Sequence, residues 1–160
     1  MPISLPCCAD FLAQEGVRHH LDVEAGAILV AFVTRQYQNA RGEKLAVVRI
    51  DLPDEGYRFR VALDRAFPVG QDAAAACATL CRLAADTPLV RIEFDAAFEN
   101  LRMVIDAVVE DGSLTRLQVL SMVDRLVEAA EAWHAALADL HRTRAATPDT
   151  KPGRRRPRAA

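Results

Sequence analysis

The segment from residue 86 to residue 140 constrains the fold of this chain more than any other part of it. It begins with two short stretches in which apolar and charged residues alternate, as in β-strands that bury one face. A long stretch follows in which apolar residues recur every three or four positions, as in an amphipathic helix. Two such strands leading into a long helix predict a sheet with a helix packed across it.

The long helix carries its own start signal, because Thr115 is followed three residues later by Gln118, which is a capping box. The apolar face beyond it comprises Val119, Met122, Leu126, Ala130, Trp133, Leu137 and Leu140. Leu120 and Val127 lie beside this face and widen it. The extra width makes these two residues candidates for a partner or dimer contact; the alternative is a helix seated deeply against its own sheet.

The first half of the chain predicts one short helix and three strands. The helix spans residues 5–15, with Pro6 near its start and Gly16 after its end. Strand patterns cover residues 20–34, in which Gly26 marks a turn or bulge, and residues 44–52 and 57–63. In the last of these, Tyr57, Phe59, Val61 and Leu63 face inward and Arg58 and Arg60 outward, which favours an antiparallel sheet with one solvated face.

A second helix is predicted over residues 71–85 and ends before Pro88, and the last two strands cover residues 89–95 and 101–110. The predicted order is α-β-β-β-α-β-β-α. We therefore expect an α+β two-layer domain, with a five-stranded, mostly antiparallel sheet and its helices on one face. From about His141 the apolar periodicity stops, which predicts a folded domain over residues 1–142 and a disordered tail over residues 143–160.

The domain and the tail differ in net charge. Residues 1–140 carry 13 Lys or Arg and 21 Asp or Glu, a net charge of −8, whereas residues 141–160 carry seven Lys or Arg against one Asp, a net charge of +6. A basic tail can contact phosphate groups, which makes a nucleic acid or other polyanion the alternative partner. The candidate residues are Lys151, Arg154, Arg155, Arg156 and Arg158. No aromatic residue lies among them to stack on bases, and a solvated tail is the simpler interpretation.

The residue patterns that carry catalysis or bind cofactors are missing from the sequence. It contains no nucleophile motif, glycine-rich phosphate loop or HExxH helix. Cys7 and Cys8 near a helix start are the best candidate nucleophile. Cys77 and Cys81 share a helix face, but two soft ligands do not make a zinc site, even with His19 and His20 imagined as the others. We expect no catalysis, no cofactor and no metal.

Nothing in the sequence predicts a membrane partner. The longest uncharged apolar run, residues 25–33, has nine residues, which is about half of a membrane-spanning helix. The first residues lack the basic and apolar regions of a signal peptide. We therefore expect a cytoplasmic protein.

Three stretches of the chain resemble a known family. They are LCRLAADTPLVRIEF from residue 80, LRMVIDAVVEDGSLTRLQ from residue 101 and VDRLVEAAEAW from residue 123. These stretches resemble the YbjN-like family of bacterial sensory-transduction regulators, which shares its fold with the small type III secretion chaperones. The match covers roughly the last half of the domain and extends over residues 16–63, but leaves out the tail.

The resemblance implies a non-catalytic protein- or peptide-binding module, chaperone-like or regulatory, and commonly a homodimer. Its motifs are helix caps, strand alternation and a helix face. It therefore implies a class of activity and transfers no site residue to this sequence.

Overall fold

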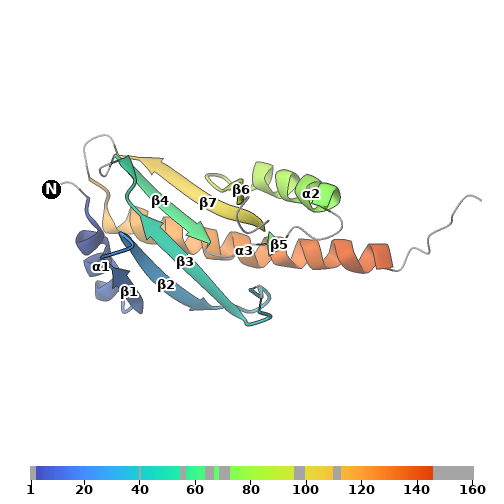
Figure 1. Cartoon of the computed structure of the whole chain (residues 1–160), viewed down its shortest axis with the longest axis horizontal. Helices are drawn as coiled ribbons and strands as arrows, with labels where there is room; N and C mark the ends of the chain where they lie inside the picture. Colours follow the sequence, from blue (N-terminus) through green and yellow to red (C-terminus); the bar gives the residue numbers. More distant parts are fainter. Residues whose placement is uncertain are drawn as a thin grey trace, which may run out of the picture.

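A computed structural model describes residues 3–39, 41–54, 57–63, 67–68, 73–95, 100–109 and 113–145 of the chain. Over these residues the chain forms three helices and one seven-stranded sheet (Figure 1). The helices are α1 (Leu5–Gln14), α2 (Ala73–Asp86) and α3 (Arg116–Ala145). The strands are β1 (His19–Asp22), β2 (Ala27–Val33), β3 (Leu45–Asp51), β4 (Arg58–Leu63), β5 (Phe67–Pro68), β6 (Arg91–Asp95) and β7 (Asn100–Val108).

All the strand pairs are antiparallel, and β7 organises one half of the sheet. Strands β1, β2, β3, β4 and β7 follow one another as neighbours. The second half of β7 pairs with β4, and its first half pairs with β6 and with the two residues of β5. Strands β1 and β6 therefore form the two edges of the sheet.

The prediction of five strands was wrong, and the first reason is a turn at Gly26. Residues 20–34 form a hairpin in which β1 pairs with β2, from His19 opposite Val30 to Asp22 opposite Ala27. Gly26 has a φ of +60°, a left-handed conformation that glycine adopts without steric penalty. An Asp22 side-chain oxygen accepts a hydrogen bond from the Ala25 amide at 2.9 Å, which closes this turn.

The second addition is β5, whose two residues pair with Leu101 and Asn100. A two-residue pairing has no periodicity that a sequence pattern can reveal. The observed order is α-β-β-β-β-β-α-β-β-α, with six strands of four residues or more. The α+β class, the antiparallel sheet and the helices on one face are confirmed, and Figure 1 shows α3 running along one face of the sheet.

The core lies between the sheet and the helices. Paired strands align their inward residues, as in Val30 opposite Val48 and Val61 opposite Ile105. The predicted apolar face of α3 meets them, since Val119, Met122, Leu126, Ala130, Trp133 and Leu137 are all buried; the Leu140 side chain lies outside the described residues. Tyr57 was predicted to face inward and is instead 67% exposed. Its amide is bonded to the Asp54 carbonyl at 3.0 Å, so it still belongs to the turn before β4.

Helix ends follow the capping signals. In α1, the Ser4 hydroxyl accepts a hydrogen bond from the Cys7 amide at 3.3 Å. At the start of α3, the Gln118 amide donates to the Thr115 hydroxyl at 3.2 Å, and the Thr115 amide donates to the Gln118 side chain at 2.8 Å. The predicted capping box is confirmed, and it fixes where the long helix begins.

Candidate functional site

The candidate site is the face of the sheet that the helices leave uncovered, which we call the outer face (Figure 1). The strand register defines it as the residues that alternate with the buried ones. It has two halves of different chemistry. Strands β4, β6 and β7 present mostly charged side chains, and strands β2 and β3 present mostly aliphatic ones.

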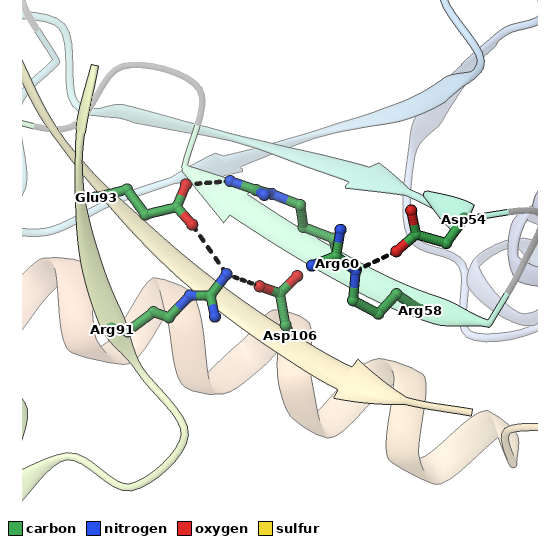
Figure 2. A network of polar contacts seen from close by, with 6 residues as sticks. All are labelled: Asp54, Arg58, Arg60, Arg91, Glu93 and Asp106. Atoms are coloured by element: carbon green, nitrogen blue, oxygen red, sulfur yellow. Dashed lines mark hydrogen bonds and ion pairs between the residues drawn. The ribbon is translucent and has the colours of Figure 1, made fainter. Parts of the chain in front are cut away.

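In the charged half, Arg60, Arg91, Glu93 and Asp106 form an ionic network (Figure 2). Glu93 on β6 forms ion pairs with Arg60 on β4 and with Arg91, the latter at 2.9 Å. Arg91 also pairs with Asp106 on β7. Since β7 lies between β4 and β6, the network links three strands through their side chains as well as through their backbones.

Asp106 is the most deeply placed member of the ionic network. Its side chain is 10% exposed, whereas that of Arg91 is 50% exposed. One carboxylate oxygen pairs with Arg91, and the other, Oδ1, is buried and has no hydrogen-bond partner among the described residues. Burying a carboxylate is costly unless it is paired, and the ion pair with Arg91 compensates the burial of Asp106.

Two further ion pairs flank the ionic network. Arg58 Nε lies 2.8 Å from a carboxylate oxygen of Asp54, which is 62% exposed (Figure 2). Arg49 pairs with Asp51 at 2.7 Å and also donates to the carbonyl of Ala25 at 3.1 Å. Surface pairs of this kind contribute little to stability and serve mainly to hold long side chains in place.

Two apolar residues of the charged half are buried. Val104 and Ala62 belong to the outer face, yet they are 0% and 3% exposed. They pair with each other across β7 and β4, and their other register neighbours are Arg91 and Arg49. Long charged side chains therefore flank both residues, whereas Val108, at the end of β7 and opposite Arg58, is 73% exposed on the same half.

The aliphatic half is open. We call Leu29, Ala31 and Val33 of β2, with Leu45 and Val47 of β3, the aliphatic strip. The register sets Ala31 beside Val47 and Val33 beside Leu45. Val33 is 89% exposed, Ala31 is exposed and the other three are half-buried; none belongs to the core cluster or packs against it.

The loop after the strip is attached to α3 by Glu131. The Glu131 carboxylate accepts hydrogen bonds from three successive backbone amides, those of Arg35 at 2.5 Å, Gln36 at 2.7 Å and Tyr37 at 2.7 Å. We call this arrangement the Glu131 clamp. The ring of Tyr37 is buried and meets the ring of His134 edge-on at 5.6 Å between centroids. The clamp joins the end of β2 to the helical layer.

The hydrogen bonds of the clamp determine the direction in which the pKa of the Glu131 carboxyl group is shifted. Desolvation by burial raises the pKa of Glu131, but the three amide hydrogen bonds and the charge of Arg35 outweigh it, and the net pKa lies below its ordinary value. Burial lowers the pKa of His134, and the charge of Glu131 partly opposes that shift. Glu131 is therefore an anion at neutral pH. Sequence analysis did not identify it, because nothing in the sequence links a helix carboxylate to a loop more than 90 residues earlier.

The predicted site residues are placed as follows. Leu120 and Val127 on α3 are half-buried and pack against the protein's own core. The five basic tail residues, Lys151, Arg154, Arg155, Arg156 and Arg158, lie outside the described residues. The described backbone of α3 continues to Ala145, three residues beyond the predicted domain boundary. The dimer face and the role of the tail stay predictions.

The candidate nucleophile is unfavourably placed. Burial, and then the neighbouring Cys7, raise the pKa of Cys8 to about 12, whereas a catalytic thiol needs a lowered pKa. Cys77 and Cys81 lie on α2, which packs against β6, and His19 lies on β1 at the other edge of the sheet. Within the described ranges, no three His, Cys, Asp or Glu side chains are grouped as metal ligands. No described helix is long and apolar enough to span a membrane.

The ionic network makes a prediction about stability. Replacing Arg91 with leucine leaves Asp106 as a nearly buried carboxylate without its partner, so we expect the free energy of unfolding to fall by about 1–3 kcal/mol. Urea unfolding followed by circular dichroism measures the change. The matched control is Asp54→Asn, which removes an exposed ion pair and should change stability by less than about 1 kcal/mol. Equal effects of the two substitutions would contradict the special dependence of Asp106 on Arg91.

Comparisons with known proteins identify the fold. No protein-family model matches the chain, and no curated protein matches its sequence. In structure it is similar to YbjN from E. coli, a candidate transcription regulator, with 15% identity, a TM-score of 0.66 and coverage of 88% of this chain and 94% of that one. It is also similar to a chain of the HopA1–SchA chaperone–effector complex, with 10% identity, a TM-score of 0.55 and coverage of 79% and 88%.

A chain of the ExsC–ExsE complex is similar as well, with 15% identity, a TM-score of 0.55 and coverage of 84% and 96%. At these identities the likeness concerns the fold. The fold implied by the sequence resemblance, YbjN-like and shared with type III secretion chaperones, is confirmed.

Proposed function

We propose that this chain is a non-catalytic protein- or peptide-binding module, chaperone-like or regulatory, of the YbjN-like kind. The observation that carries the proposal is the aliphatic strip, a contiguous group of uncovered apolar side chains on a sheet face without a helix. Contiguous exposed apolar surface marks sites of interaction with other molecules. The likeness in fold to a chain of a chaperone–effector complex supports the same class of activity.

The chemistry of the described residues supports binding over catalysis. The arginines of the ionic network are neutralised by Glu93 and Asp106, and this leaves them poorly suited to bind a small anionic substrate. The thiol of Cys8 is buried with a raised pKa, which opposes nucleophilic chemistry. The proposal also includes a homodimer, as the resemblance implies, and a location in the bacterial cytoplasm, as expected from the sequence, with the tail outside the binding module.

The proposal is tested by capture from a lysate of the source organism with the full-length tagged chain as bait. We expect a protein partner retained in stoichiometric amount. A bait in which Lys151, Arg154, Arg155, Arg156 and Arg158 are all replaced by serine is the matched control, and it should retain the same partner. Capture of nucleic acid alone, lost with the control bait, would contradict the proposal and favour the tail as the functional part.

A further inference from the structure

We infer that the aliphatic strip binds an amphipathic helix with acidic flanks, presented by a partner protein. This inference rests on the proposed function and names both the surface and the chemistry of the partner. The contrast between the two halves of the outer face is its first support. In the charged half Val104 and Ala62 are buried and the exposed Val108 lies at the end of β7, whereas the strip groups five aliphatic side chains, of which Val33 is 89% exposed.

The second support is local charge. Basic residues lie near one end of the strip: Arg35 and Lys44 lie next to its open end and Arg41 lies in the loop between β2 and β3, whereas Arg49, opposite Leu29, is paired with Asp51. Residues 27–51, which span β2 and β3, carry four Lys or Arg and two Asp or Glu, a net charge of +2, in a body whose net charge is −8.

Two acidic residues belong to this segment, Asp51, which is paired with Arg49, and Glu43 in the loop, and its net charge stays positive with both included. The carboxylate of Glu43 accepts a hydrogen bond from the Asn39 side chain at 2.8 Å and is engaged within its own loop. A partner that covers the strip therefore gains from Asp or Glu residues placed along its flanks.

The third support is size. Residues two apart in a strand are separated by about 6.7 Å, so Leu29 to Val33 spans about 13 Å, which is the length of roughly nine helical residues. The strip is two strands wide, about 5 Å between strand axes, which suits the apolar face of one helix. The strip offers a partner its side chains, because the backbones of β2 and β3 are paired with neighbouring strands. A helix suits such a surface, because its backbone groups are already hydrogen-bonded within the helix.

A second copy of this chain fits the strip poorly. A symmetric contact between two strips would bring the basic ends of both chains, with Arg35, Arg41 and Lys44, into one interface. Like charges facing each other at an interface are unfavourable. Charge complementarity therefore favours an acidic partner over self-association.

The test begins with phage display of random peptides of about 16 residues, long enough for nine helical residues and both helix ends. Peptides are selected on the full-length chain and sequenced, and the affinity of each is measured by fluorescence anisotropy. We expect selected peptides with apolar residues at i, i+3 or i+4, and i+7, and with an excess of Asp and Glu. The substitution Val33→Asp should weaken their binding by about tenfold or more.

The matched control is Leu117→Asp, an equally polar change at a residue of α3 that is 74% exposed and away from the strip. It should leave peptide affinity unchanged. The double substitution Arg35→Glu with Lys44→Glu should weaken binding of acidic peptides by about tenfold or more and abolish their selection bias.

Four results would overturn the inference. Selected peptides without an acidic excess, or peptides that bind the Val33→Asp variant as tightly as the unsubstituted chain, place binding elsewhere and leave the proposed function intact. A change from dimer to monomer on Val33→Asp, seen by sedimentation, assigns the strip to self-association. Failure to select any peptide removes the docking site, while the capture experiment decides the proposed function independently.

Discussion

Replacing Trp133 with alanine is expected to lower the free energy of unfolding by about 3–5 kcal/mol. Trp133 is 1% exposed at the middle of the apolar face of α3, so the substitution removes the largest buried side chain of the described core. Its indole nitrogen donates to the Thr87 hydroxyl at 3.4 Å, and that hydroxyl donates to the Leu83 carbonyl at 2.7 Å. The side chain therefore joins α3 to the end of α2 as well as filling the core.

Urea unfolding followed by circular dichroism is the suitable measurement, because Trp133 is the only tryptophan and its fluorescence is lost in the variant. Leu117→Ala on the same helix is the control, since that leucine is 74% exposed and should change stability by less than about 0.5 kcal/mol. Trp133→Phe retains most of the side-chain volume but lacks the hydrogen bond. Its loss of stability should lie between those of Trp133→Ala and Leu117→Ala. A loss below about 1 kcal/mol for Trp133→Ala would contradict the packing described above.

Replacing Glu131 with glutamine is expected to lower stability by about 1–3 kcal/mol at neutral pH. The carboxylate accepts from three backbone amides, whereas glutamine offers one acceptor oxygen and turns an NH₂ donor toward the remaining amides. Glu128→Gln, one turn earlier on α3, is the matched control. Burial and then Glu128 raise the pKa of Asp124, so removing that charge should leave stability unchanged or slightly higher.

The pH dependence of the Glu131 effect has a definite sign. The pKa of Glu131 in the folded state lies below the ordinary value of 4.5, so the folded protein stabilises the anion. Its contribution is therefore fully present above the ordinary pKa and is lost as the pH falls through the folded pKa. The free energy of unfolding should be measured for the unsubstituted chain and for Glu131→Gln at a series of pH values. The difference between the two should shrink as the pH falls. A difference that stays constant or grows below pH 4.5 would contradict the clamp.

Local patterns predicted what depends on neighbours in sequence. The spacing of apolar residues identified the buried face of α3, and Thr115 with Gln118 identified its start, because both signals lie within one or two helical turns. Gly26 was compatible with a bulge or a turn, and the choice depended on whether β1 would pair with β2. The strand count was wrong for that reason, and because β5 pairs over only two residues.

Contacts between distant residues could not be predicted in the same way. The alternation placed Arg60 and Glu93 on solvated faces, but their pairing across β7 depends on a register that no single strand encodes. Glu131 meets a loop more than 90 residues earlier, where only the tertiary fold brings the two together.

The aliphatic strip did leave a signal in the sequence. The run AILVAFV is apolar at every position, a pattern that on its own is typical of a strand buried on both faces. A continuous apolar run in an antiparallel sheet with one uncovered face places half of its side chains outside the core. Leu29, Ala31 and Val33 are those side chains.

The Glu131 clamp has a consequence for the entropy of association. It begins two residues after Val33 and ties the open end of the strip to the helical layer through three hydrogen bonds. A surface held in this way is already ordered before a ligand arrives, and association then loses little conformational freedom on the protein's side. The entropic penalty of forming the complex falls on the partner, which must fold its own segment into a helix.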